Sequence, residues 1–453
     1  MYFLYSVLTG LAAIITAPYW LIQGLRHDKY LSNLGERLGF SVPGISMLPA
    51  DRPGGIWIHA VSVGEALAGV ALAKRLKEAN PQRPLVISTT TITGQQVARE
   101  RMPFAADAVV YFPFDWAFSV RKVMDAVKPA VIVVMETEIW PNFLREAGRR
   151  KVPVIYSSGR ISGRSFARFQ KWLGIFGFYL RPLLASALSN VGVFLMQTET
   201  DAERLGALGV PADRVKVSGN LKYDQELPAA TPLSTWLEAE CKEQGRWPVI
   251  IAGSVVANEE PLALIAFGVV QGDYPEALLV LAPRKPERFG AAAEFIEEAH
   301  HQFVRRSELA VAGPVASSGD NSRSFTASTT VLLLDSIGEL ASLYRLADGV
   351  FVGGSLVPSG GHNILEPAAF GKVPVFGPSM ENFAAIASRF VEAGAAIQVT
   401  SPEDAGVEWI HLLKSPEKMQ KMGEIARQLV ETSRGALERT LAEISRRLEG
   451  TPR

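Results

Sequence analysis

The sequence predicts an α/β protein with two Rossmann-like domains that face one another across a cleft, preceded by an N-terminal membrane-anchor helix. Three observations support this prediction. Short apolar segments alternate with amphipathic helical segments over residues 56–208, and again over residues 249–376. Such alternation is typical of parallel sheets covered by helices on both faces. A stretch with two prolines, residues 225–235, separates the two series, and residues 2–25 contain no charged side chain.

The uncharged segment 2–25 is long enough to cross a hydrocarbon core of about 30 Å. Its aromatic residues cluster toward both ends, and no small-residue cleavage site follows it, so a cleaved signal peptide is not predicted. Arg26, His27 and Lys29 follow directly, which by the positive-inside rule places the rest of the chain in the cytoplasm. We expect residues 1–29 to anchor the chain to a membrane, by crossing it or lying in it. The alternative is an apolar helix docked on the protein itself.

The composition of the chain limits the kinds of bound group and partner that it can have. The single cysteine, Cys241, excludes an intramolecular disulfide and a cysteine-based zinc site. The six histidines show no metal-binding spacing, so no metal site is expected. We expect no cofactor either. The net charge is zero, but residues 1–225 contain 26 Lys+Arg against 17 Asp+Glu. A basic first half predicts anionic partners there, either phosphates or an anionic membrane surface.

The elements follow from the apolar periodicity in chain order. The first half should contain strands at 56–61, 85–89, 130–135, 152–156 and 192–196, with helices at 66–80, 93–101, 140–150 and 200–208. The second half should contain strands at 249–252, 277–281, 330–334, 349–352 and 373–376, a serine-rich loop at 316–329 and one continuous helix at 416–448. We therefore expect domains at 30–227 and 228–453, and the final helix can pack back on the first domain.

Two common nucleotide motifs are absent from the sequence. No GxGxxG follows a first strand, and no GxxxxGK[ST] occurs anywhere, which argues against a dehydrogenase and a P-loop NTPase. Two Rossmann-like halves with a phosphate loop only in the second half is the layout of GT-B glycosyltransferases. This is an analogy of fold, and the function has to be argued from the site.

The glycine-rich stretch 352–378 predicts that phosphate loop. It reads as strand, turn, helix, turn and strand, with six glycines between positions 353 and 377. Glycine lets backbone N–H groups approach a ligand, and a helix start offers free N–H groups and a positive dipole end. Asn363 or Ser359 can cap the helix, and Glu366 can accept hydrogen bonds from sugar hydroxyls. The alternative is an ordinary βα turn with Glu366 paired to the helix dipole.

Three more turns of the second half should open on the same edge of the sheet. Ser254 follows the strand at 249–252, and Asp335–Leu340 follows the strand ending at residue 334. Arg284 and Lys285 follow the strand at 277–281, and their charges suit a phosphate. An exposed arginine in a proline-flanked loop is the alternative interpretation of Arg284.

In the first half, Glu65 follows the first strand after the turn-forming Gly64. A carboxylate there can act as the base that takes a proton from an attacking hydroxyl, or it can simply favour the helix start. A second acidic pair, Glu136 and Glu138, also follows a strand. Such carboxylates are costly to bury unless they are paired or functional, and pairing with Arg160 or Arg164 is the structural alternative.

Residues 159–172 interleave basic and aromatic side chains. Such a segment can lie on a membrane surface or hold lipid phosphates, or it can be a solvated helix with a core face. No nucleic-acid motif accompanies it, so nucleic acid is not an expected partner.

Five segments together resemble one family. They are His59–Glu65, Glu136–Asn142, Gly219–Asp224, Ala282–Phe289 and Gly360–Pro367, and they are similar to the motif set of the 3-deoxy-D-manno-octulosonic acid (Kdo) transferases of lipopolysaccharide synthesis. The resemblance covers nearly the whole chain, including residues 36–39. It implies a GT-B fold, CMP-Kdo as donor and a lipid A precursor (lipid IVA) as acceptor. It also implies an inverting, metal-independent reaction at the cytoplasmic face of the inner membrane.

The resemblance also implies residue roles. Glu65 matches the family's proposed general base. The positions that fall in the donor-binding region are Ser254, Arg284, Lys285, Gly354, Ser355, Gly361, His362, Asn363 and Glu366. The expected acceptor-binding positions are Ser62, Gly64, Glu138 and Arg160. The chain departs from the family pattern twice: Ser157–Arg160 replaces the usual Asn-Ala-Arg, and Gly253–Val256 replaces the usual Gly-Ser-Thr-His.

Two other classes of function stay open at the sequence level. One is a different GT-B enzyme, either a UDP-sugar transferase to a membrane lipid or a sugar-nucleotide epimerase. An epimerase would have no use for residues 2–25. The other is a membrane-attached scaffold that keeps a nucleotide pocket, which would have no use for Glu65 and Glu366.

Overall fold

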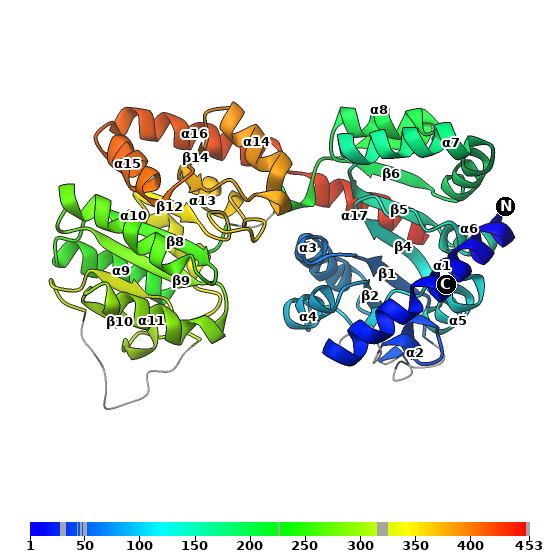
Figure 1. Cartoon of the computed structure of the whole chain (residues 1–453), viewed down its shortest axis with the longest axis horizontal. Coiled ribbons are helices and arrows are strands. Elements are labelled where there is room, and N and C mark those ends of the chain that lie inside the picture. Colours follow the sequence, from blue (N-terminus) through cyan, green and yellow to red (C-terminus); the bar gives the residue numbers. More distant parts are fainter. Residues whose placement is uncertain are drawn as a thin grey trace. The chain divides into compact units, whose positions relative to one another are not determined.

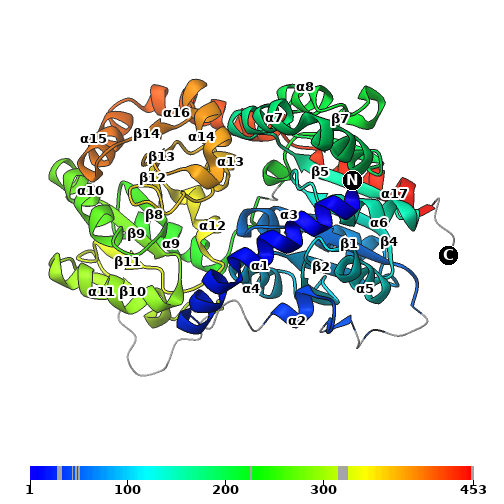
Figure 2. The same ribbon diagram turned by 45° about the vertical axis from the view of Figure 1, so that its right-hand side comes forward.

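The computed structural model describes residues 1–27, 33–42, 44, 45, 48, 52–224, 227–314 and 325–449, and of residues 18–27 it describes only the backbone. The chain forms two compact units, drawn in Figures 1 and 2. Unit 1 comprises Met1–Gln225 and Ser433–Arg453, and unit 2 comprises Glu226–Thr432. Most of the serine-rich loop expected at 316–329 lies outside the described residues.

Unit 1 is built on a parallel sheet, which has seven strands in the described chain, in the order β3-β2-β1-β4-β5-β6-β7. The strands are β1 (Gly55–His59), β2 (Leu85–Thr89), β3 (Ala108–Tyr111), β4 (Pro129–Met135), β5 (Val154–Gly159), β6 (Val193–Met196) and β7 (Val215–Val217). The helices are α1 (Tyr2–His27), α2 (Leu34–Arg37), α3 (Val63–Ala79), α4 (Ile92–Arg101), α5 (Ala117–Val127), α6 (Pro141–Arg149), α7 (Gly163–Leu188), α8 (Glu199–Ala207) and α17 (Ala436–Glu449). The strand order reverses between β1 and β4, where open α/β sheets present their binding crevice.

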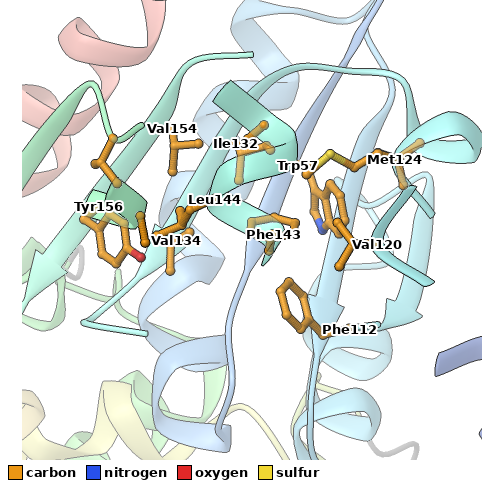
Figure 3. Close-up of a cluster of buried hydrophobic side chains, with 14 of the residues drawn as sticks. Trp57, Phe112, Val120, Met124, Ile132, Val134, Phe143, Leu144, Val154 and Tyr156 are labelled. Atoms are coloured by element: carbon orange, nitrogen blue, oxygen red, sulfur yellow. The ribbon is translucent and has the colours of Figure 1, made fainter. Parts of the chain in front are cut away.

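Both faces of this sheet are buried, as expected for strands that read as continuous apolar runs. Figure 3 shows part of one face, where Trp57 of β1 lies among Phe112, Phe143 and Ile132. The Trp57 and Phe143 rings meet edge to face with centroids 5.2 Å apart, and Trp57 Nε1 donates to Ser88 Oγ at 2.8 Å. Each such buried aromatic ring contributes about 1.5–3 kcal/mol, so the strand ends that carry polar residues are held on a rigid base.

Unit 2 is built on a second parallel sheet, with seven described strands in the order β10-β11-β9-β8-β12-β13-β14. The strands are β8 (Val249–Val255), β9 (Leu278–Pro283), β10 (Phe303–Arg305), β11 (Val331–Leu333), β12 (Gly349–Val352), β13 (Pro374–Phe376) and β14 (Ile397–Gln398). The helices are α9 (Pro232–Glu243), α10 (Glu260–Asp273), α11 (Phe289–Glu298), α12 (Leu340–Leu343), α13 (Leu365–Ala369), α14 (Ala384–Glu392), α15 (Pro402–Leu413) and α16 (Pro416–Thr432). Here the strand order reverses between β8 and β12.

The continuous helix expected over 416–448 is wrong. Helix α16 ends at Thr432 and α17 begins at Ala436, because Gly435 between them has φ = +102°, a conformation that no helix continues through. Asp224 fixes the start of α17 by accepting hydrogen bonds from the backbone N–H groups of Gly435 and Leu437, at 2.5 and 2.8 Å. Helix α17 therefore packs against β4 and β5 of unit 1 (Figure 1, red).

Helix α1 is docked on unit 1 through polar contacts. Tyr2 Oη and Ser186 Oγ of α7 are 3.0 Å apart, and the Asn142 side chain donates to Ser6 Oγ at 3.0 Å. The opposite side of α1 exposes apolar residues at helical spacing, which are Leu4, Val7, Leu8, Leu11, Ile14 and Ile15. Within the part of the chain that the structure describes, no helix combines the length and apolar content needed to cross a bilayer.

Candidate active site

The acidic residues of unit 1 lie at the strand-order reversal. Glu65 stands in the first turn of α3, directly after β1, and Glu136 and Glu138 follow β4. Because β1 and β4 pair in parallel, their carboxyl ends open on the same edge of the sheet. This is the edge where sequence reasoning placed the site of the first half.

The Glu65 side chain is held by its own helix start. Ser62 is the N-cap residue of α3. Its hydroxyl donates to Glu65 Oε1 at 2.8 Å, and it also accepts from the Glu65 backbone N–H at 3.4 Å. The Val61 backbone N–H donates to Glu65 Oε2 at 2.8 Å. The carboxylate is thus fixed in one orientation while only 6% of the residue is exposed.

This environment raises the pKa of the Glu65 carboxyl group to near neutral pH. Burial and the nearby charge of Glu136 raise the pKa of Glu65 to about 7, although the hydrogen bonds from Val61 and Ser62 act in the opposite direction. Burial and Glu136 also raise the pKa of Glu138 to about 7. A general base works best when its pKa lies near the operating pH, so Glu65 is suited to that role.

Two cations belong to the same cluster. An atom added at the Cβ position of Gly64 would lie 3.8 Å from Lys222 Nζ, so the ammonium reaches the N-terminus of α3. Burial lowers the pKa of Lys222, the charges of Glu136 and Glu65 raise it, and Arg160 lowers it. Five charged side chains, from four different strand ends or loops, therefore meet at this edge.

Arg160 does not neutralise the acidic pair. In the described ranges, no ion pair within 4.0 Å joins Glu136 or Glu138 to Arg160 or Arg164. The Arg160 backbone N–H instead donates to Thr137 Oγ1 at 2.8 Å. The structural alternative, an acidic pair neutralised by these two arginines, is thus not what the structure shows.

The backbone at this edge is strained. Glu136 has φ = +56° and Ser158 has φ = +55°, a left-handed conformation that costs a non-glycine residue about 1–2 kcal/mol. Such strain clusters at functional sites. Ser158 accepts a hydrogen bond on Oγ from the Leu221 backbone N–H at 3.0 Å. This contact fixes the start of the segment that carries Lys222.

In unit 2, the predicted donor residues gather around the reversal between β8 and β12. Ser254, at the end of β8, has φ = +58°. The backbone N–H of Arg284 donates to Val255 O at 2.8 Å, which joins the ends of β9 and β8. Lys285 is two-thirds exposed, and its Nζ lies 3.5 Å from a carboxylate oxygen of Glu287.

The turn before α13 brings four more predicted residues together. Burial and the charge of Arg284 lower the pKa of His362 to about 4, so its imidazole is neutral at physiological pH. Asn363 Oδ1 accepts from the Leu365 backbone N–H at 3.1 Å, and Asn363 Nδ2 donates to Glu366 Oε1 at 3.2 Å. Gly361 has φ = +72° and donates its N–H to Gly354 O at 2.8 Å.

The expectation that this turn offers free N–H groups needs one correction. The N–H groups of Gly354, Ser355 and Leu356 already donate to the Glu259 carboxylate, at 2.5, 2.9 and 2.9 Å. These three N–H groups therefore already bind an anion of the protein itself. Glu259 comes directly before α10, and its side chain reaches the turn after β12. That Gly354 and Ser355 take part in donor binding stays a prediction.

Sequence reasoning missed Glu259 and did not assign a role to Lys222 or Glu136. Lys222 lies inside the Gly219–Asp224 segment that carries part of the resemblance, so the motif was its only signal. Glu259 is one of two adjacent glutamates, and nothing in its spacing indicates a contact 95 residues away. In the described ranges, no cluster of three or more His, Cys, Asp or Glu side chains could hold a metal.

The chain is similar to known proteins over most of its length. Residues 32–225 match the family model described as 3-Deoxy-D-manno-octulosonic-acid transferase (kdotransferase). A 3-deoxy-D-manno-octulosonic acid transferase of Haemophilus influenzae is 33% identical over 429 residues, which cover 93% of this chain and 92% of that protein.

Two solved structures are also similar. The C-terminal CMP-Kdo binding domain of WaaA from Acinetobacter baumannii shares 29% identity, with a TM-score of 0.39, and covers 44% of this chain and 97% of that domain. A Listeria monocytogenes protein, provisionally assigned as a UDP-N-acetylglucosamine 2-epimerase, shares 14% identity with a TM-score of 0.51, and covers 88% of this chain and 98% of that one. The second likeness shows the fold, which is an α/β architecture of the GT-B type with two Rossmann-like units.

The predicted α/β fold class with two Rossmann-like domains is thus confirmed, whereas the membrane anchor stays a prediction. The Haemophilus influenzae relative identifies the enzyme class as glycosyltransferase. By its identity to that relative over nearly its whole length, and by the family match of its first half, the chain belongs to the 3-deoxy-D-manno-octulosonic acid transferase family.

Proposed function

We propose that this protein transfers Kdo from CMP-Kdo to a hydroxyl group of a lipid A precursor, lipid IVA, with inversion at the anomeric carbon. The observation that carries the proposal is Glu65. Its carboxylate is buried, oriented by Ser62 and Val61, and has its pKa raised to about 7. Membership of the family supports Kdo as the transferred sugar. The resemblance of the five sequence segments supports CMP-Kdo as the donor and a lipid A precursor as the acceptor.

The reaction needs one base and no metal. The acceptor hydroxyl oxygen forms a bond to the anomeric carbon of Kdo, while the bond from that carbon to the CMP phosphate oxygen breaks. The electron pair leaves with the phosphate, and the hydroxyl proton goes to Glu65. The transition state has oxocarbenium character, as in glycosyl transfer generally, and a single displacement inverts the carbon.

The positive charges of each unit suit these anionic substrates. Kdo carries a carboxylate and CMP carries a phosphate. Arg284, which lies near the neutral His362, is therefore proposed to bind the donor phosphate. In unit 1, Lys222 and Arg160 beside Glu65 would hold an anionic group of the acceptor. The Glu366 carboxylate, held by Asn363, would accept a hydrogen bond from the ribose.

Two helices of unit 1 support the proposal that the protein attaches to a membrane. The outer side of α1 exposes a stripe of aliphatic residues, and α7 exposes Trp172, Ile175, Phe178 and Tyr179. Arg168 and Lys171 are exposed on α7 as well. Apolar residues flanked by basic ones favour an anionic lipid surface. We therefore propose that the protein works at the cytoplasmic face of the inner membrane, where it would meet the proposed lipid acceptor.

A direct assay tests the proposal. The purified full-length chain is incubated with CMP-Kdo and tetra-acylated lipid A precursor, and the lipid is analysed by mass spectrometry. We expect a mass gain of one or more Kdo residues, and no gain when UDP-N-acetylglucosamine replaces CMP-Kdo. A chain that leaves the lipid unchanged with CMP-Kdo, or that converts the UDP-sugar instead, would contradict the proposal.

A further inference from the structure

The turn after β12 binds a carboxylate of the protein itself, the side chain of Glu259. Glu259 is fully buried. Its carboxylate accepts hydrogen bonds from four backbone N–H groups, those of Gly354, Ser355 and Leu356 and, at 3.3 Å, that of Val256. Successive N–H groups around a left-handed residue form an anion-binding concavity, and Gly354 has φ = +70°.

Among the described residues, no Lys, Arg or His nitrogen lies within 4.0 Å of the Glu259 carboxylate. Burial raises the pKa of Glu259, and the four backbone N–H groups act in the opposite direction. A buried carboxylate without a counter-ion is retained only where its hydrogen bonds are numerous and specific. The contacts therefore define the shape of the turn.

The same turn supports the predicted donor residues. Ser355 Oγ donates to Val352 O at 2.6 Å and accepts from the Gly377 N–H at 2.9 Å, which joins β12 to the end of β13. Gly354 O accepts from the Gly361 N–H. The His362 ring packs so closely on Gly354 that an added Cβ would lie 2.9 Å from its Cδ2.

We propose that Glu259 is a positioning residue for donor binding: its carboxylate fills the anion-binding turn permanently and holds His362 and the start of α13 toward the donor. The donor phosphate then binds to side chains, with Arg284 foremost, and not to the N–H groups of Gly354 and Ser355. This inference rests on the proposed function, because it assigns a role within the CMP-Kdo site.

The experiment compares CMP binding by calorimetry for the full-length wild type, Glu259→Gln, Glu259→Asp and Glu259→Ala. Asp348→Asn is the matched control, since Asp348 is a part-buried carboxylate that accepts the Val249 N–H at 2.9 Å at the other edge of the same sheet. The free energy of unfolding of each variant is measured alongside. Glu259→Ala is also titrated with CMP in the presence of formate, a carboxylate small enough to enter the vacated turn.

We expect Glu259→Gln and Glu259→Ala to weaken CMP binding about tenfold. In Glu259→Gln the side-chain NH₂ group faces backbone N–H groups, and in Glu259→Ala these N–H groups have no side-chain acceptor. Formate should restore most of the affinity of Glu259→Ala, and Asp348→Asn should lose stability without losing affinity. A purely structural role predicts equal loss in the control and no rescue by formate. Either result would overturn the proposal, and so would tighter CMP binding by Glu259→Ala, which would mean that the phosphate itself occupies the turn.

A second measurement uses the wild type and does not depend on whether the variants fold. A crystal structure of the full chain with CMP should show the Glu259 carboxylate still on Gly354 and Ser355, with the phosphate against Arg284. A phosphate bound in place of Glu259 would refute the inference while leaving the proposed function intact. Failure of the wild type to bind CMP at all would instead remove the proposed function, and this inference with it.

Discussion

Ser62 and Glu65 hold one another at the start of α3. The Glu65 N–H donates to Ser62 Oγ at 3.4 Å, and Ser62 Oγ donates to Glu65 Oε1 at 2.8 Å. A capping interaction of this kind normally stabilises the helix by about 1 kcal/mol. Here it also orients a carboxylate whose pKa is raised to about 7, so the same contact contributes to stability and to the chemistry proposed for the site.

The pH dependence of the reaction should report this carboxylate. We expect kcat/KM to fall about tenfold for each pH unit below about 7, because Glu65 must be ionised to take a proton, and to level off above it. Glu136→Gln removes a negative charge that raises the pKa of Glu65, so its profile should shift to lower pH. Glu78→Gln, an exposed change on the same helix, is the control. Profiles that coincide for wild type and Glu136→Gln would argue against Glu65 as the titrating group.

Replacing Glu65 should stabilise the fold at high pH. The folded-state pKa lies above the ordinary value of 4.5, so the folded protein binds the proton more tightly than the unfolded chain. The stability contributed by this group is therefore full below about 4.5 and is lost as the pH rises through about 7. Glu65→Gln should gain about 3 kcal/mol of unfolding free energy at pH 8 and almost none at pH 4. Urea titrations at both pH values check this, and a less stable variant at pH 8 would count against it.

Arg284 should bind the donor phosphate and act on His362 at the same time. Arg284→Ala is expected to raise the Kd for CMP-Kdo about tenfold or more, because a charge-assisted contact to phosphate is lost. The pKa of His362 should rise from about 4, since the guanidinium charge helps to lower it. Calorimetry and a histidine titration by NMR measure the two effects. Lys242→Ala, an exposed lysine paired with Glu238 in the same unit, should change neither; unchanged donor affinity in Arg284→Ala would remove Arg284 from the site.

The exposed aromatic residues of α7 should mediate membrane binding. Trp172→Ser combined with Phe178→Ser removes two large exposed side chains, and each buried aromatic contributes about 1.5–3 kcal/mol of transfer free energy. Co-sedimentation with phosphatidylethanolamine–phosphatidylglycerol vesicles should therefore drop at least tenfold. Phe104→Ser, an exposed apolar change elsewhere in unit 1, should bind as the wild type does. Equal binding by the double variant would exclude α7 from the contact.

The fold was predictable because both sheets are parallel and buried. Strands such as β4, apolar throughout and fully buried, appear in the sequence as continuous runs. The strands that were not predicted are short ones, β3, β7, β10 and β14, whose few residues carry little periodicity. The break at Gly435 was not predicted because the helical pattern resumes after it. That α17 belongs to unit 1 depends on long-range contacts, such as that of Asp224 with Gly435 and those of α17 with β4 and β5.

The site was predictable in part for a related reason. Residues that follow strands, such as Glu65 and Glu138, must open on the carboxyl edge of a parallel sheet, so their neighbourhood follows from topology. The partners of a charged group do not follow from it. The fourfold hydrogen bonding of Glu259 depends on how two distant turns approach, as does the contact of Lys222 with the start of α3. Periodicity contains no information about either.

The turnover of Glu65→Gln with CMP-Kdo and tetra-acylated lipid A precursor tests the central claim most directly. The variant keeps the size of the side chain and an acceptor oxygen for the Val61 N–H, and it loses the ability to take a proton. We predict that kcat falls by about 10²–10⁴-fold at pH 8, while CMP affinity and the folded structure are preserved. A Glu65→Gln enzyme that transfers Kdo at a rate within a few-fold of the wild type would contradict the account.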